Sequence, residues 1–191
     1  IYTRWSQIAR YDSNWRFISL TDGKQPAFVW INMIVMRFFD DPLMGGRVVS
    51  VICGLFVVIG LYFVTKEIFR GHKHARIMGL VASSLAVFYP FLLVYDRLAL
   101  YESMIAAFMV WALYFQITLI RRIRFDMSMI TGLVMGGAVL TKSSGFLALY
   151  LIPFIFLLFD FKKKNRRSRL IRAVFYFILS AVIVNVCYAI L

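Results

Sequence analysis

The chain has 191 residues, of which 62% are hydrophobic and 17% aromatic, and its formal net charge is +13. Apolar runs near the length of a bilayer crossing recur along it, which excludes a soluble globule and predicts an all-α, polytopic membrane helical bundle. Cys53 and Cys187 lie within apolar runs, where they behave as small apolar residues and indicate no disulfide framework.

The first residues of the chain are predicted to form an amphipathic surface helix. Ile1, Trp5 and Ile8 share one helical face. Arg4 and Arg10 lie around the other face. A helix with this division lies in the membrane interface rather than across the bilayer.

A polar hinge follows at residues 19–26, which carries Asp22 and Lys24 ahead of Pro26. Proline suits the first turn of the helix that comes next. The apolar stretch at residues 27–39 covers roughly 20 Å of helix, too short to cross a bilayer. We therefore expect an interfacial or re-entrant helix there, with the hinge just above the membrane. A solvated turn between two surface helices is the alternative for the hinge.

Six spanning helices are predicted from the apolar runs, at about 46–69, 77–95, 102–120, 127–141, 145–161 and 169–191. The fourth and fifth are shorter than the roughly 20 residues that a crossing needs, so they borrow flanking residues or form a tight hairpin. Pro90 and Pro153 are expected to kink their helices. Gly132 and Gly136, spaced as G-x-x-x-G, predict close helix packing.

Basic residues gather in three of the connections between these helices. They are Lys66, Arg70, Lys73, Arg76, Arg121, Arg122, Arg124, Lys162, Lys163, Lys164, Arg166, Arg167, Arg169 and Arg172. The positive-inside rule makes these connections cytoplasmic, so the basic excess is a topology signal and no nucleic-acid partner is expected. Residues 1–45 then form an external loop with interfacial helices, and residues 46–191 the transmembrane bundle. Because no crossing precedes the external loop and the chain ends within an apolar run, we expect a fragment that lacks a preceding spanning helix and a C-terminal part.

The charged residues that face outward fall in three places. Lys24 belongs to the hinge, and Lys142 to the turn between the two short helices. Asp96, Arg97 and Glu102 belong to the second external connection. Charges cost several kcal/mol at membrane depth, so this set predicts a functional site. The basic groups suit a phosphate, and the carboxylates suit a general base, a divalent cation or a partner for the arginine.

Each of these residues also has an ordinary explanation in a membrane protein. Arg97 can reach toward the interface along its own stem, and Lys142 can anchor a helix end there. Asp96 can be a structural partner, and Glu102 can interact favourably with the dipole of the helix that it begins. The placement of all of them on the less basic side favours the functional interpretation.

Four strings carry a resemblance to a known family, and they occur in order along the chain. They are Thr-Asp-Gly-Lys-Gln-Pro at 21–26, Gly-Arg-Val-Val-Ser at 46–50, Arg-Leu-Ala-Leu-Tyr-Glu at 97–102 and Leu-Thr-Lys at 140–142. Together they resemble the membrane glycosyltransferases of the C superfamily, in the branch of the protein O-mannosyltransferases and lipid A aminoarabinose transferases. The resemblance implies transfer of a sugar from a polyprenyl-phosphate carrier to a lipid or protein acceptor. It also implies a plasma (inner) membrane protein whose active site is on the external face.

The resemblance also implies roles for single residues. Lys24 would contact the lipid phosphate, and Arg97 would belong to the rim of the active site. Glu102 would fill a second acidic position, which is more usually Asp, and with Asp96 it is a candidate catalytic carboxylate. Lys142 matches a recurrent lysine, for which a phosphate or interfacial role is expected. The principal catalytic Asp of such enzymes would lie upstream of the first residue.

Apolar grooves between the helices would hold the prenyl tail, and a divalent cation stays open as a cofactor. A polytopic transporter or a lipid flippase or scramblase is the alternative function. Such proteins favour ionisable sites near the bilayer midplane in repeated halves, and the sequence shows no such repeat. A purely structural membrane subunit would leave the external charges without a role.

Overall fold

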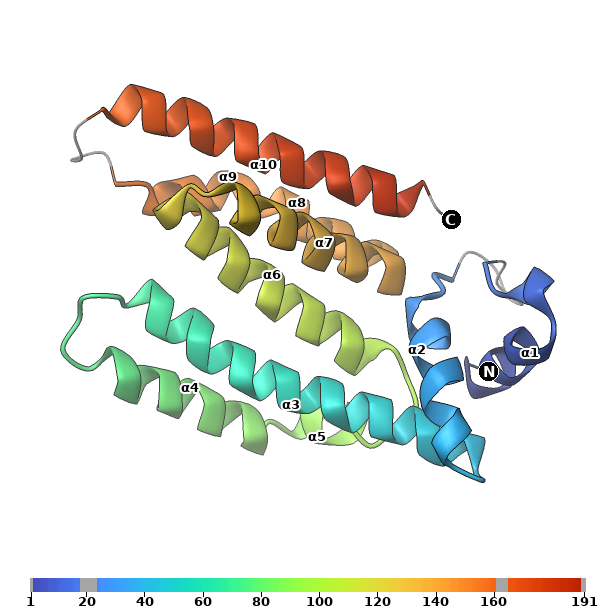
Figure 1. The fold of residues 1–191 in the computed structure, drawn as a ribbon. Helices are drawn as coiled ribbons and strands as arrows, with labels where there is room; N and C mark the ends of the chain where they lie inside the picture. Colours follow the sequence, from blue (N-terminus) through green and yellow to red (C-terminus); the bar gives the residue numbers. More distant parts are fainter. Residues whose placement is uncertain (1, 18–23, 161–164, 190–191) are drawn as a thin grey trace.

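The computed structural model describes residues 2–17, 24–160 and 165–189. All regular elements in these ranges are α-helices or short 3-10 helices, which confirms the all-α helical bundle (Figure 1). Within the same ranges, three helices are long and apolar enough to cross a membrane by length and composition. They are α3 (Pro42–Ile68), α6 (Glu102–Arg122) and α10 (Arg166–Tyr188).

Helix α3 begins at Pro42, four residues before the predicted start at residue 46. Asp41 and Pro42, which precede the apolar run, favour this earlier start. The Asp41 carboxylate accepts a hydrogen bond from the backbone N–H of Leu43 at 2.9 Å, as an N-cap side chain does. Pro42 occupies the first turn, where the missing N–H costs nothing. The pair Asp-Pro was therefore a start signal that the apolar pattern alone did not reveal.

The predicted span at 77–95 is two helices, α4 (Ala75–Phe88) and α5 (Pro90–Tyr95). Tyr89 lies between them in an extended conformation, with φ −73° and ψ 114°. A proline disfavours the helical conformation of the residue before it and cannot donate a backbone hydrogen bond. Pro90 therefore breaks this segment instead of only kinking it.

The predicted single helix at 145–161 is also wrong, since the structure has four short pieces in its place. They are η3 (Ser143–Phe146), α8 (Leu147–Tyr150), α9 (Ile152–Ile155) and η4 (Phe156–Leu158). Pro153 stands in the first turn of α9, where proline is tolerated. The pieces run back beside α7 (Phe125–Thr141), as in the tight hairpin that was the alternative (Figure 1).

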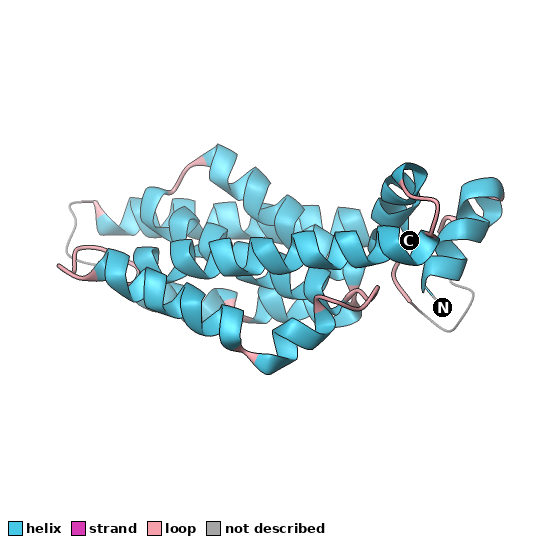
Figure 2. Ribbon diagram, turned by 90° about the horizontal axis from the view of Figure 1, so that it is seen from below, coloured by secondary structure: helices cyan, strands magenta, loops and turns pink. Residues whose placement is uncertain are grey.

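The N-terminal elements stand together at one end of the bundle (Figures 1 and 2). They are α1 (Tyr2–Tyr11), η1 (Ser13–Trp15), α2 (Ala27–Val35) and η2 (Met36–Phe38). The short helix predicted after the hinge is confirmed.

The inward face of α1 differs from the prediction. Trp5 is buried as expected, but Ile8 is only half-buried, and Ile1 lies outside the described residues. Ser6 is buried instead, because its hydroxyl accepts a hydrogen bond at 3.1 Å from the side-chain amide of Asn32 on α2. A polar residue can enter the core where it finds such a partner, which a hydrophobic pattern does not reveal.

Small residues bring α7 and α10 close together. A Cβ added at Gly132 would lie 2.8 Å from the Cβ of Ile183, and one added at Gly136 would lie 2.7 Å from Cys187 Sγ. The hydroxyls of Ser128 and Ser180 lie 3.1 Å apart across the same interface. The predicted packing role of the G-x-x-x-G pattern is therefore confirmed between these two helices.

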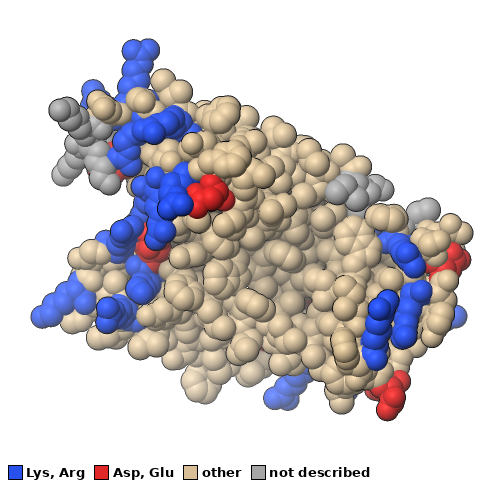
Figure 3. Space-filling view, in the orientation of Figure 1, with Lys and Arg blue, Asp and Glu red and all other residues tan. Residues whose placement is uncertain are grey.

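The two ends of the bundle differ in charge and in shape. Basic residues gather at the end where α3 and α6 finish and α4, α7 and α10 begin (Figures 1 and 3). We call this the basic end. The opposite end holds the N-terminal elements, the loop at 96–101 and the turn at 142–145. The predicted site residues in the described part of the chain all belong to this opposite end.

Candidate active site

Glu102 and Lys142 meet where two helices end. Glu102 is the first residue of α6, and Lys142 follows α7 in an extended conformation with φ −159° and ψ 144°. The ammonium nitrogen of Lys142 lies 3.8 Å from Glu102 Oε1. The second carboxylate oxygen, Oε2, is buried and has no hydrogen-bond partner among the described residues. The carboxylate is therefore held by one long ion pair and keeps a free acceptor.

Two tyrosine rings connect this ion pair to Lys24. Lys142 Nζ lies 4.9 Å from the ring centroid of Tyr101, and Lys24 Nζ lies 5.0 Å from that of Tyr2. The two rings contact each other edge to face, with centroids 4.8 Å apart. Burial, reinforced by the neighbouring Tyr101, raises the pKa of Tyr2 above its ordinary value. The structure thus brings together Lys24, Glu102 and Lys142, of which Lys24 and Lys142 are 118 positions apart in the sequence. We call these three residues, with Tyr2 and Tyr101, the charged group.

The loop that precedes Glu102 is fixed against α3 by two small residues. A Cβ added at Gly46 would lie 2.7 Å from the Cβ of Ala99, so only glycine allows this approach. One turn further along α3, the Ser50 hydroxyl donates a hydrogen bond to the carbonyl oxygen of Leu100 at 3.1 Å. The Gly46–Ser50 string therefore has a structural purpose: it holds Tyr101 and Glu102 in place.

The turn that carries Lys142 depends on Gly145. The Gly145 N–H donates to the carbonyl oxygen of Lys142 at 2.8 Å, which closes the turn. A Cβ at Gly145 would overlap the backbone of Ala138, one turn before the end of α7. Since backbone cannot move aside as a flexible side chain can, this position requires glycine.

Asp96 and Arg97 are not joined to this group. The Asp96 carboxylate packs onto α3 at Gly54, in space that a Cβ would fill. Burial raises the pKa of Asp96, and its Oδ1 has no hydrogen-bond partner among the described residues. Arg97 is exposed, and its side chain makes no hydrogen bond or ion pair within the described ranges. Asp22, predicted beside Lys24, lies outside the described residues.

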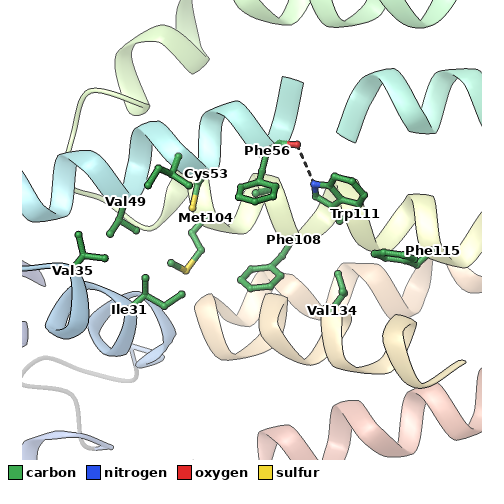
Figure 4. A pocket seen from close by; sticks show the side chains of 12 residues that line it. Ile31, Val35, Val49, Cys53, Phe56, Met104, Phe108, Trp111, Phe115 and Val134 are labelled. Carbon is green, nitrogen blue, oxygen red and sulfur yellow. Dashed lines mark hydrogen bonds between the residues drawn. The ribbon is translucent and has the colours of Figure 1, made fainter. Parts of the chain in front are cut away.

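An apolar cavity of about 430 Å³ opens between α2, α3, α6 and α7 (Figure 4). Its lining comprises Ile31, Val35, Val49, Ile52, Cys53, Phe56, Met104, Ala107, Phe108, Trp111, Phe115 and Val134. The Trp111 indole N–H donates to the carbonyl oxygen of Phe56 at 3.1 Å, which leaves the tryptophan ring as an apolar wall.

The cavity and the charged group are connected through one packed cluster. Val49 and Met104 line the cavity and also belong to the packed cluster that contains Tyr2, against which Tyr101 packs. A ligand with an anionic head and an apolar tail fits this arrangement, because the head can bind the lysines and the tail can occupy the cavity. Apolar grooves between helices were expected from the sequence. The residues that line this cavity could not be predicted, because they come from four different helices.

The described residues do not form a metal site on their own. In residues 2–17, 24–160 and 165–189, no three His, Cys, Asp or Glu side chains gather as metal ligands would. Glu102 is the member of the charged group with a free carboxylate oxygen, and a single such oxygen does not hold a divalent cation.

Comparison with known proteins identifies the family. Residues 23–188 match the family model described as dolichyl-phosphate-mannose-protein mannosyltransferase, and this is most of the chain. The chain belongs to this family. No curated protein and no solved structure matches it significantly.

Family membership confirms the resemblance seen in the four sequence strings. The protein is a membrane glycosyltransferase of the mannosyltransferase type. This finding favours transfer of a sugar over the transporter or flippase alternative. The matched range contains Lys24, Glu102, Lys142 and the whole cavity lining, while Tyr2 on α1 lies outside it.

Proposed function

We propose that this protein transfers a sugar from a polyprenyl-phosphate donor to a lipid or protein acceptor at the non-cytoplasmic face of the membrane. One observation carries the proposal: Lys24 and Lys142 lie on the rings of Tyr2 and Tyr101, and the packed cluster that contains these rings also supplies Val49 and Met104 to the wall of an apolar cavity. A lipid-linked phosphate carries a negative charge, which suits the lysines, and an apolar tail, which suits the cavity.

In this proposal the donor phosphate lies between Lys24 and Lys142, with Arg97 at the rim. Ammonium groups stabilise phosphate as mobile point charges, and a partly dry interface strengthens their effect. The prenyl tail enters the cavity past Val49 and Met104. A volume of about 430 Å³ suits one section of such a chain, with the remainder among the membrane lipids.

Transfer breaks the bond between the anomeric carbon of the sugar and the phosphate oxygen, and it forms a bond from that carbon to the acceptor oxygen. The phosphate leaves with the bonding electron pair, which the two lysines stabilise. The acceptor hydroxyl gives its proton to a carboxylate acting as general base. Of the two predicted carboxylates, Glu102 is better placed, because it lies beside Lys142 while Asp96 packs onto α3.

The charge difference between the two ends of the bundle supports the external face. The basic end takes the cytoplasmic side under the positive-inside rule. The charged group around Glu102 lies at the opposite end and therefore on the external side.

The test of the proposed activity uses the intact protein in membranes and radiolabelled polyprenyl-phosphate mannose. Substitution of Lys24, Arg97 or Glu102 by Ala should abolish transfer, while Lys73→Ala at the basic end should not. Insertion into the membrane should be intact in all four variants. Undiminished transfer in the three site variants would reject the assignment.

The membrane face has its own test. In a background with Cys53→Ala and Cys187→Ala, Ser143→Cys places a thiol in the exposed turn after Lys142, and Lys73→Cys places one at the basic end. A membrane-impermeant maleimide added to intact cells should label only the first. Labelling of only the second would reverse the orientation and overturn the external site.

A further inference from the structure

The two tyrosines of the charged group pack against each other between Lys24 and Lys142. Tyr2 lies on α1, and Tyr101 immediately precedes the first residue of α6. Tyr2 is only 8% exposed and also packs edge to face on Phe28 of α2, with centroids 6.0 Å apart. Its ring is therefore fixed by packing on two sides, and Tyr101 is fixed against it.

Each ring carries one lysine on its face. The distances of 5.0 Å for Lys24 on Tyr2 and 4.9 Å for Lys142 on Tyr101 are within the range of a cation–π interaction. A lysine side chain is flexible, so its ammonium group otherwise samples many positions. An ammonium group that is already in place loses less freedom when a phosphate binds, which increases affinity.

We propose that Tyr2 and Tyr101 are positioning residues that hold the Lys24 and Lys142 ammonium groups ready for one lipid phosphate. The inference rests on the proposed function and extends it to two residues that no motif assigned. The rings act through the lysines, and their hydroxyl groups take no part in phosphate binding.

Paired substitutions at each tyrosine separate the ring from the hydroxyl. Phe keeps the aromatic face and removes the hydroxyl, whereas Leu keeps an apolar side chain and removes the face. The readouts are the Kd for decaprenyl phosphate, measured with the intact protein in detergent, and the KM and kcat for polyprenyl-phosphate mannose. We expect Tyr101→Phe and Tyr2→Phe to stay within about twofold of the unsubstituted protein. Tyr101→Leu and Tyr2→Leu should raise Kd and KM about 5- to 30-fold and leave kcat within about threefold.

A double-mutant cycle shows whether each ring acts through its lysine. With Lys142→Ala already present, adding Tyr101→Leu should weaken binding by less than about twofold. The same holds for Tyr2→Leu added to Lys24→Ala. Full additivity would show that the ring matters only for packing, and a Phe variant as weak as the Leu variant would assign binding to the hydroxyl. Either result overturns the inference.

The same measurements distinguish failure of the inference from failure of the proposed function. If the unsubstituted protein binds decaprenyl phosphate no better than decaprenol, phosphate recognition itself is wrong, and the positioning role falls with it. If it prefers the phosphate and Lys142→Ala removes that preference while Tyr101→Leu does not, only the positioning role is wrong.

Discussion

Helices α3 and α6 run side by side and carry a glutamate near each end of their interface, and the two glutamates have different surroundings. At the basic end, Glu67 Oε1 lies 3.1 Å from Arg121 Nη1 and 3.2 Å from Arg70 Nη1. Arg121 also donates to the carbonyl oxygens of Glu67 and Ile68 at the end of α3. At the other end, Glu102 has one ion pair at 3.8 Å and a free Oε2.

Glu67 therefore stabilises the fold, whereas Glu102 is available to a ligand. Around Glu67, one arginine satisfies both the side chain and the last turn of α3, so the helix ends are tied together. Around Glu102, the lysine rests on an aromatic ring and the free oxygen is unsatisfied. A buried acceptor without a partner costs stability, and such costs are concentrated at functional sites.

The largest expected effect comes from neutralising the two glutamates separately. Glu102→Gln should lower the transfer rate by about 100-fold or more, because a general base is lost, and should leave the thermal midpoint of unfolding nearly unchanged. Glu67→Gln should do the reverse, with transfer per folded molecule within about twofold and a loss of stability of about 1–3 kcal/mol. Transfer assays and thermal unfolding in detergent measure both. Equal loss of transfer in the two variants would remove the distinction between the ends.

The second-largest difference is expected between alanine substitutions at Gly145, near Lys142, and at Gly71, at the basic end. Gly145→Ala forces a Cβ into the backbone of Ala138, so it should displace the turn that holds Lys142 and cost about 1–3 kcal/mol as well as most of the transfer activity. Gly71 at the basic end has open space around it and a φ of 93°. Gly71→Ala should therefore cost only about 1 kcal/mol of backbone strain and leave transfer unchanged. If both variants behave alike in thermal unfolding and transfer, the close contact at Gly145 has no consequence.

Filling the cavity should affect donors according to the length of their tail. Ala107 lines the cavity and Ala106 on the same helix does not. Ala107→Phe should raise the KM for a long-chain polyprenyl-phosphate donor about tenfold, by blocking tail contacts, and should affect a short-chain donor much less. Ala106→Phe is the matched control and should show no dependence on tail length. A KM that is unchanged for both donors in Ala107→Phe would place the tail elsewhere.

The smallest effects distinguish the two arginines around Glu67. Arg121 is mostly buried and donates to two backbone carbonyls, so Arg121→Ala should destabilise the protein by about 1–2 kcal/mol. The Arg70 side chain is 58% exposed, and Arg70→Ala should cost less than about 0.5 kcal/mol. Transfer per folded molecule should be unchanged in both, as thermal unfolding and transfer assays would show. A larger cost for Arg70→Ala would reverse the assignment of the structural partner.

Much of the bundle was predictable because apolar run length and charge placement report directly on membrane crossings. The start of α6 at Glu102 and the end of α7 at Thr141 are at the predicted residues. The approach of Glu102 to Lys142 was also predictable in outline, since alternating crossings place both at one end.

Other features depend on contacts between distant segments, which no local pattern encodes. Asp96 was predicted in the same external connection as Glu102, and the absence of a side chain at Gly54, which the sequence does not link to Asp96, lets its carboxylate pack onto α3. The break at Tyr89 depends on how Pro90 packs against the surrounding helices, because the sequence is compatible with either a kink or a break at this proline. The Tyr2–Tyr101 contact joins two residues 99 positions apart and follows only from the packing of α1 against the loop at 96–101.

Binding of polyprenyl phosphate, measured without turnover, tests the difference between the two ends most directly. The intact protein is titrated with decaprenyl phosphate and with decaprenol, and two variants remove the same number of charges from opposite ends: Lys24→Ala with Lys142→Ala, and Lys66→Ala with Lys73→Ala. We predict that the unsubstituted protein prefers the phosphate, that the first variant loses this preference by about 30-fold or more, and that the second keeps it. Equal loss in both variants, or loss only in the second, would contradict the account.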